Sequence, residues 1–255
     1  MEFIWHGTAS VEITASAGRI LFDPFVPLKG SKTAVKLEEF DGFTDILVTH
    51  GHFDHIVSIP EIVSRNPQTK IYCTKTPLQT LSRKGVPGKN LREIEFGKQY
   101  DVGGFLITAI HGRHAVLPKA DPAIVWKLLR SENRGNLPFL LKENRLCREK
   151  DETVFYQIEA EGKTVSLMGS LNLREDIVYP QNADVLVLPY NGWEDTYTHA
   201  ARVIERLRPK RVLLDHYDDA FPPMTGLIPV DVSRITREYR GRVSPMQLRK
   251  AEELL

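Results

Sequence analysis

Four side chains that can bind a metal ion stand within six residues of one another: His50, His52, Asp54 and His55. They follow the apolar run 45–48, which is typical of a buried strand, so the pattern puts them where a strand gives way to a loop. Imidazole nitrogens and carboxylate oxygens suit zinc, manganese or iron. In an extended turn, His50 and His52 point to one side while Asp54 and His55 face a neighbouring point. Burying these groups without a cation is costly, so the pattern predicts a metal site.

Two further apolar runs lead into histidines. The predicted strand 105–110 is followed by His111 and His114, which compete for one role, and a later strand is followed by Asp215 and His216. An α/β fold whose strand ends feed loops on one side builds a single site from distant parts of the chain. We therefore expect these histidines to meet the first four side chains.

The motif at residues 50–55, with a strand before it and a helix after it, resembles the metal-binding motif of the metallo-β-lactamase superfamily. The segments 4–10 and 20–24 are similar to the branch that contains the ascorbate-phosphate lactonase, and the resemblance covers nearly the whole chain. It implies an α/β (α+β) fold, a four-layer αββα sandwich in which two mixed sheets are flanked by helices. We expect a single domain over residues 1–255.

The resemblance also implies two sets of ligands. It favours His114 over His111 as the third ligand of a first cation, beside His50 and His52. A second cation is expected to bind Asp54, His55 and His216. Behind these ligands, Asp23 is expected to hold the metal loop in shape, with Asp215 in a similar supporting place. Zinc is the expected metal, one or two ions, and manganese or iron would also fit.

The chain departs from the family at Ser170, which follows Gly169 where family members have an aspartate that bridges two metals. A neutral hydroxyl offers much less to two close cations than a carboxylate does. Two arrangements follow from this. In the first, one metal binds the three histidines and Asp54 is the catalytic base. In the second, both metals bind, the second more weakly, and Asp215 or Asp218 partly replaces the missing carboxylate.

Residues 118–150 are predicted to be an insertion with eight Lys or Arg against four Asp or Glu. It is either a solvated excursion or a lid or subunit contact that lends positive field to an anionic substrate. With the lactonase-like opening, this predicts a hydrolase that uses metal-activated water on a small, anionic ester, lactone or phosphodiester. A non-catalytic metal-binding or regulatory protein, or a mono-metal variant, is the alternative. The expected substrate rim consists of His111, Arg113, Trp193 and Tyr217.

The composition is that of an ordinary globular chain. The 255 residues include 34 Lys and Arg against 33 Asp and Glu, a net charge of +1, which indicates neither nucleic acid nor membrane as a partner. No apolar stretch is long enough to span a bilayer, and no exposed apolar helix is predicted. Two cysteines, Cys73 and Cys147, and the lack of a secretory signal at the first residues favour the cytoplasm. A small-molecule substrate is expected, and a homo-oligomer stays open.

Several elements can be predicted from local patterns. A capping box at Ser58 starts a helix, and Thr198 is expected to cap another. The chain is expected to open with an antiparallel meander and to contain a hairpin over 153–168. Residues 231–239 and 245–254 are predicted to be closing helices.

Overall fold

Two seven-stranded sheets form the centre of the molecule. The structure is a computed structural model that describes residues 1–116, 122–191, 194–224 and 230–254. The first sheet contains β1 (Glu2–Trp5), β2 (Val11–Ala15), β3 (Gly18–Phe22), β4 (Asp45–Leu47), β5 (Lys70–Cys73), β6 (Leu91–Glu93) and β14 (Ala251–Glu253). The second contains β7 (Gln99–Val102), β8 (Phe105–His111), β9 (Val154–Ala160), β10 (Lys163–Met168), β11 (Val185–Pro189), β12 (Arg211–Asp215) and β13 (Val243–Pro245).

The strand orders are β14-β1-β2-β3-β4-β5-β6 and β13-β12-β11-β10-β9-β8-β7. Each sheet mixes antiparallel and parallel pairs: β1, β2 and β3 form the predicted meander, and β3, β4, β5 and β6 run parallel. In the second sheet, β9 and β10 form the predicted hairpin, and β10, β11, β12 and β13 run parallel. Parallel neighbours end at the same edge, so the loops after β3, β4, β10, β11 and β12 can gather at one end of the sandwich.

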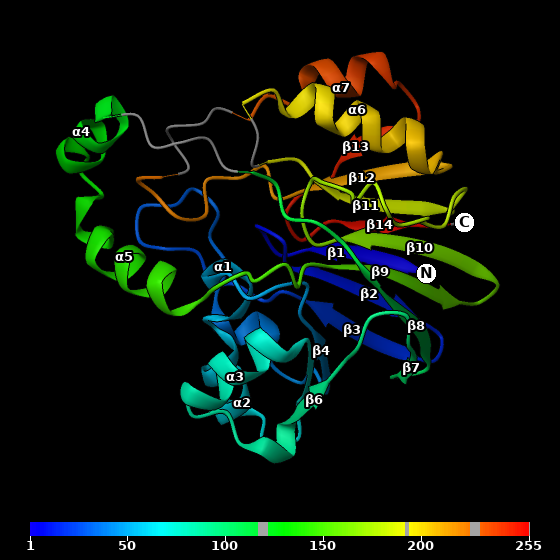
Figure 1. Cartoon of the computed structure of the whole chain (residues 1–255), viewed down its shortest axis with the longest axis horizontal. Helices are drawn as coiled ribbons and strands as arrows, with labels where there is room; N and C mark the ends of the chain where they lie inside the picture. Colours follow the sequence, from blue (N-terminus) through cyan, green and yellow to red (C-terminus); the bar gives the residue numbers. More distant parts are fainter. Residues whose placement is uncertain (117–121, 192–193, 225–229, 255) are drawn as a thin grey trace.

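Helices cover both outer faces of the pair of sheets (Figure 1). The first sheet is covered by α1 (Phe53–Ile56), α2 (Ile59–Arg65) and α3 (Lys75–Arg83), and the second by α6 (Thr196–Leu207) and α7 (Ser233–Glu238). The predicted αββα sandwich is therefore confirmed. The remaining helices, α4 (Pro122–Arg130) and α5 (Leu137–Leu146), belong to the predicted insertion and extend to one side.

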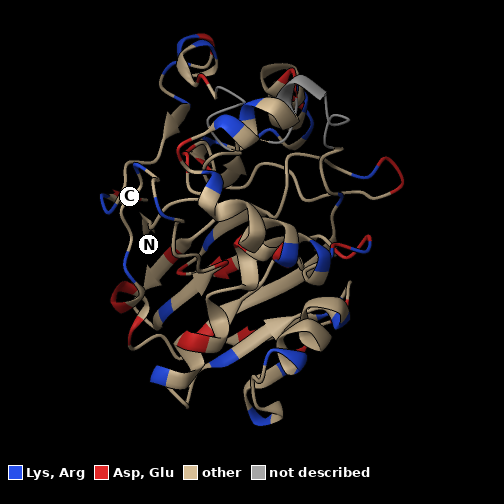
Figure 2. Cartoon of the chain, turned by 90° about the vertical axis from the view of Figure 1, so that its left-hand side faces the viewer, with Lys and Arg blue, Asp and Glu red and all other residues tan. Residues whose placement is uncertain are grey.

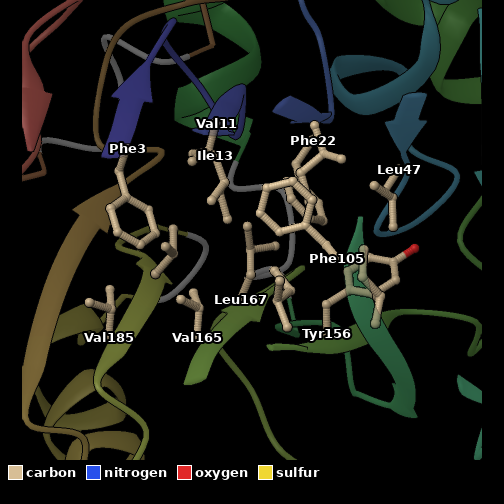
Figure 3. Close-up of a cluster of buried hydrophobic side chains, with 14 of the residues drawn as sticks. Phe3, Val11, Ile13, Phe22, Leu47, Phe105, Tyr156, Val165, Leu167 and Val185 are labelled. Carbon is tan, nitrogen blue, oxygen red and sulfur yellow. The ribbon is translucent and has the colours of Figure 1, made fainter. Parts of the chain in front are cut away.

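The core between the sheets is built from side chains of both. Figure 3 shows Phe3, Ile13 and Phe22 of the first sheet facing Tyr156 and Leu167 of the second. The strands β11 and β12 carry apolar residues on both faces because helices cover their outer side. In β11, for example, the buried Val187 packs in this core, whereas the buried Leu188 packs against α6.

The chain end differs from the prediction. Residues 245–254 do not form a helix: they leave β13 in the second sheet and return as β14, which pairs antiparallel with β1, Glu2 opposite Glu253. The tertiary pairing overrides the helical propensity of the Lys, Ala and Glu residues in this segment. The closing helix predicted at 231–239 is present as α7.

Two predicted helix caps also differ. Helix α6 begins at Thr196, and the Asp195 side chain accepts a hydrogen bond from the Thr198 amide at 3.1 Å, so Asp195 is the cap. Ser58 precedes α2 without capping it, because its hydroxyl accepts a hydrogen bond from the Val26 amide instead.

The insertion is anchored on one side and open on the other. In α5, the buried Glu143 pairs at 2.5 Å with Lys84, the residue that follows α3. In α4, Val125, Trp126 and Leu129 are about half exposed, at 47, 56 and 57 %. The expectation that the chain has no exposed apolar helix was wrong.

Figure 2 views this side of the molecule and shows basic and acidic residues interspersed over it. Among the described residues, no helix is long and apolar enough to cross a membrane.

We expect Leu167→Ala to lower the free energy of unfolding by about 2–5 kcal/mol, because Leu167 fills the core between the sheets and its truncation leaves a cavity. Denaturant unfolding measures this change. Val178→Ala is the control, since Val178 is 95 % exposed and its loss is expected to cost about 0.5 kcal/mol or less. Equal effects of the two variants would contradict the proposed core.

Candidate metal centre

Two groups of three side chains with metal-binding atoms lie at one end of the sandwich. His50, His52 and His114 form the first group, and the second consists of Asp54, His55 and His216; within each group the ligand atoms lie within 4.8 Å of one another. The predicted ligands therefore come together in the predicted two sets of three. They come from the loop after β4, helix α1, and the segments that follow β8 and β12.

The first group has the spacing of a tetrahedral site. His50 Nε2 and His52 Nδ1 are 3.1 Å apart. Two nitrogens that bind zinc at 2.0–2.1 Å with a tetrahedral angle would be separated by about 3.3–3.4 Å. The ring of His114 lies 4.8 Å from that of His50 and 4.5 Å from that of His52, measured between centroids. Three imidazoles thus converge on one small volume.

Hydrogen bonds behind the rings leave the inward nitrogens free to bind a cation. The buried Asp23 carboxylate accepts from the Thr49 amide at 2.8 Å, from the Thr49 hydroxyl at 2.6 Å and from His55 Nδ1 at 2.8 Å. Since the Thr49 hydroxyl donates to Asp23, it accepts from His50 Nδ1 at 3.1 Å. The network therefore places a proton on Nδ1 of His50 and of His55, so that Nε2 is the atom each ring can offer to a cation.

His114 is fixed in the same way from the second sheet. Its Nδ1 donates to the Ala115 carbonyl at 2.7 Å, which leaves Nε2 unprotonated. The amide of Ala115 in turn donates to the Ser170 hydroxyl at 3.0 Å. Ser170 thus holds the segment after β8 that carries His114.

The second group centres on Asp54. Its Oδ2 lies 3.3 Å from His216 Nε2 and 3.7 Å from His55 Nε2. His216 has a left-handed backbone, φ 54°, and its amide donates to the Thr8 carbonyl at 2.8 Å. Non-glycine residues seldom adopt this conformation, so the surrounding contacts hold the imidazole in place at some cost in strain.

The electrostatics of the two groups differ. Burial and the neighbouring imidazoles lower the pKa of His50 far below its usual value, and burial with His114 lowers the pKa of His52 to about 4. Burial opposes the charge on His216 as well, but the Asp54 carboxylate outweighs it and raises the pKa of His216 to about 9. The imidazoles of the first group are therefore neutral, the form in which histidine binds zinc, and the second group is an ionic cluster.

The donor set fits a divalent cation. Asp23, Asp54 and Asp215 are buried, and in the described part of the chain none of them pairs with a Lys or Arg. Burial raises the pKa of Asp215 to about 7, and its Oδ1 finds no hydrogen-bond partner among the described residues. The titratable partners of Asp23 and Asp54 are imidazoles, and when these bind as neutral ligands a dication would supply the positive charge that the buried carboxylates need.

Two glycines allow the loops to approach. A Cβ at Gly51 would lie 2.3 Å from the Arg148 carbonyl oxygen, so the insertion packs directly on the metal loop. A Cβ at Gly169 would lie 2.6 Å from Thr49 Cβ, which places β10 of the second sheet against the Thr49 network of the first. Larger residues at either position would displace the loop that carries His50 and His52.

A pocket of about 200 Å³ opens beside both groups. The predicted rim residues do not line its described part. His111 stacks on Phe96 and contacts the Asp151 carbonyl, and Tyr217 stacks on Trp5 within the sandwich. Arg113 is exposed outside the pocket lining, and Trp193 lies outside the described residues.

Two parts of the site were not predicted from the sequence: the Thr49 hydroxyl behind the ligands and the pocket wall. The position of Thr49, between the strand and the first histidine, is the signal that could have indicated its hydrogen-bonding role. The wall comes from Phe53, Asn144, Pro189, Asn191, Asp218, Phe221, Met224 and Val230. Most of these residues follow strand ends or belong to the insertion, and no periodic pattern marks them.

Residues 18–217 match the family model of the β-lactamase superfamily domain, and the chain belongs to this superfamily. A metal-dependent hydrolase of Koribacter versatilis (strain Ellin345) is 28% identical over 232 residues, which cover 89% of this chain and 88% of that protein. Another, from Geobacillus sp. (strain WCH70), is 28% identical over 258 residues, covering 94% and 99%.

Solved structures share the fold. The metallo hydrolase Igni18 of Ignicoccus hospitalis aligns with a TM-score of 0.63 at 17% identity, covering 100% of this chain and 99% of that one. Zn²⁺-bound PqqB from Methylobacterium extorquens aligns with a TM-score of 0.60 at 15% identity, covering 96% and 87%. The predicted class, a metal-dependent hydrolase, is confirmed at the level of the family.

We expect Asp23→Asn to weaken metal binding by about 10–100-fold, because an amide cannot accept hydrogen bonds from Thr49 and His55 as a carboxylate does. Competition with a chromogenic chelator measures the affinity. Asp176→Asn is the control, since Asp176 is exposed and pairs only at the surface with Arg174. Unchanged affinity in a folded Asp23→Asn protein would contradict the proposed supporting role.

We expect Ser170→Asp to strengthen binding of a second cation by about tenfold or more, because a carboxylate between the two groups offsets the repulsion between dications. Elemental analysis after dialysis measures the metal retained per chain. Ser64→Asp adds the same charge at an exposed position of α2 and is expected to change nothing. The idea fails if both variants retain the metal content of the parent protein.

Proposed function

We propose that this protein hydrolyses a small ester, lactone or phosphodiester with metal-activated water at the two groups of ligands. The observation that carries the proposal is the convergence of His50, His52 and His114 beside a pocket, with the protons of His50 and His114 held on Nδ1. Three neutral histidines leave a fourth position of a tetrahedral cation open, which is typical of catalytic rather than structural zinc sites. The names of the relatives, metal-dependent hydrolases, support the same class.

The residues divide the work as follows. A divalent cation supplies Lewis-acid activation of water and substrate at neutral pH. His50, His52 and His114 hold it, and Asp23 and Thr49 fix the rings that face it. Asp54 Oδ2, which lies 3.3 Å from His216 Nε2, would be the base that takes up the proton of the attacking water. The apolar pocket wall excludes bulk water from the reacting atoms.

Ser170 favours a mono-metal variant as the second candidate. With a hydroxyl in place of the bridging carboxylate, the first group alone would hold a cation firmly, and Asp54 would act only as the base. In a two-cation form, Asp218 is better placed than Asp215 to make up the missing charge, because Asp218 lines the pocket. The alternative function that is not enzymatic is that of a metal-binding or regulatory protein.

Zinc is the metal that we propose, because the first group consists of three imidazoles and the Zn²⁺-bound PqqB shares the fold. A single domain over residues 1–255 and a cytoplasmic location are proposed as well. The buried free thiols of Cys73 and Cys147 support a reducing compartment.

We expect His52→Ala to remove about one equivalent of metal and to lower kcat/KM by about 10³-fold, because it removes a ligand from the site that activates water. Elemental analysis and assays on a panel of lactones, carboxylic esters and phosphodiesters, with added Zn²⁺ or Mn²⁺, measure both effects. His199→Ala removes a histidine of α6 outside both groups and serves as the control. Stoichiometric metal without turnover of any panel member would favour the non-catalytic alternative.

A further inference from the structure

The described lining of the pocket combines the ligands of both groups with five apolar residues: Phe53, Pro189, Phe221, Met224 and Val230. We call these five residues the apolar wall. The pocket volume of about 200 Å³ is somewhat larger than a cavity of about 150 Å³ that holds benzene. A substrate with its reacting bond at the cations would therefore place a small group against the apolar wall.

The apolar wall is part of the packed structure. The ring of Phe53 makes edge contacts with Phe25, Phe139 and Phe221, with centroids 5.6 to 6.4 Å apart. Phe25 lies in the core outside the first sheet, and Phe139 belongs to α5 of the insertion. Because Phe53 directly precedes Asp54, the wall and the second ligand group are fixed by the same short helix. The wall is thus preorganised to receive an apolar group.

No Lys or Arg lines the described part of the pocket. The insertion, whose basic residues suggested an anionic substrate, contributes only Asn144 to this lining, while its neighbours Lys142 and Arg145 are exposed. The carboxylate of Asp218 also lines the pocket and would repel an anionic group on the substrate. Among the described residues, a negative charge beyond the reacting bond would meet the rings of Phe53 and Phe221 and no Lys or Arg, so its desolvation would be unfavourable.

We propose that the site selects uncharged carboxylic esters or lactones with a short alkyl or aryl group over anionic substrates. This rests on the proposed hydrolase function and revises the expected anionic substrate. Each added methylene that reaches the wall is worth about fourfold in kcat/KM until the pocket is full. An anionic group that contacts the apolar wall in place of these methylenes gives no such increase in kcat/KM.

A matched pair of esters tests the proposal on the metal-loaded full chain. 4-Nitrophenyl butyrate and mono-4-nitrophenyl succinate share a leaving group and chain length, and differ in a terminal methyl or carboxylate. We expect kcat/KM for the butyrate to exceed that for the succinate by about tenfold or more, after correction for spontaneous hydrolysis. Equal values, a preference for the succinate, or turnover of bis(4-nitrophenyl) phosphate alone would overturn it.

Two variants of α5 locate the effect. Asn144→Lys places a cation in the pocket lining, and Leu141→Lys places the same charge on the same helix where the side chain is 72 % exposed. We expect Asn144→Lys to raise kcat/KM for the succinate, so that the ratio of the butyrate value to the succinate value falls by about fivefold. Leu141→Lys is expected to leave this ratio unchanged. Equal effects of the two variants would mean that general charge, and not the pocket, sets the preference.

Binding without turnover separates this proposal from the hydrolase function. Calorimetry with the non-hydrolysable anilides of butyric and succinic acid measures recognition alone. Tighter binding of the neutral anilide supports the proposal even if no ester is hydrolysed, in which case only the proposed function fails. Tighter binding of the anionic anilide, or binding of neither, would overturn the proposal whatever the protein hydrolyses.

Discussion

The buried carboxylate of Asp23 is the group on which the rest of the site depends. It follows β3 and reaches across to the loop after β4, where it accepts two hydrogen bonds from Thr49 and one from His55. The parallel pairing of β3 with β4, Phe22 opposite Leu47, sets this distance. A single interaction therefore links the register of the first sheet to the orientation of ligands in both groups, through Thr49 to His50 and directly to His55.

The second sheet must also be held against the first for the ligands to meet. Tyr156 of β9 donates from its hydroxyl to the Val48 carbonyl at 2.7 Å, and the Val154 amide donates to the Thr49 carbonyl at 2.8 Å. These bonds join the sheets one residue from the metal motif. His114 and His216 come from strand ends of the second sheet, so the core between the sheets is also what sets the size of the metal site.

The fold and the six ligands could be predicted from the sequence, because the ligands follow apolar strands and the ends of neighbouring parallel strands lie at one edge of a sheet. The residues of the substrate rim could not be predicted in this way. Tyr217 follows His216 directly, yet the left-handed backbone at His216 breaks strand alternation and sends Tyr217 back into the sandwich against Trp5. Nor did composition reveal the pocket wall. The charge of the insertion favoured an anionic substrate, but composition alone does not show that Asn144 is the residue of α5 that lines the described part of the pocket, because this depends on how α5 packs.

The placement of charge gives the two groups unequal roles. Two dications repel four times as strongly as two unit charges at the same distance, and a carboxylate between them offsets part of that. In this chain the carboxylates lie on the side of His216, where Asp54, Asp215 and Asp218 all raise the pKa of its imidazole, and a hydroxyl lies at Ser170. A cation held by His50, His52 and His114 needs no such help, because its ligands are neutral. A second cation gains from the carboxylates beside it but meets the first without a shared anion. By keeping water away from the two positions, the apolar wall would strengthen both electrostatic effects and so increase the difference between them.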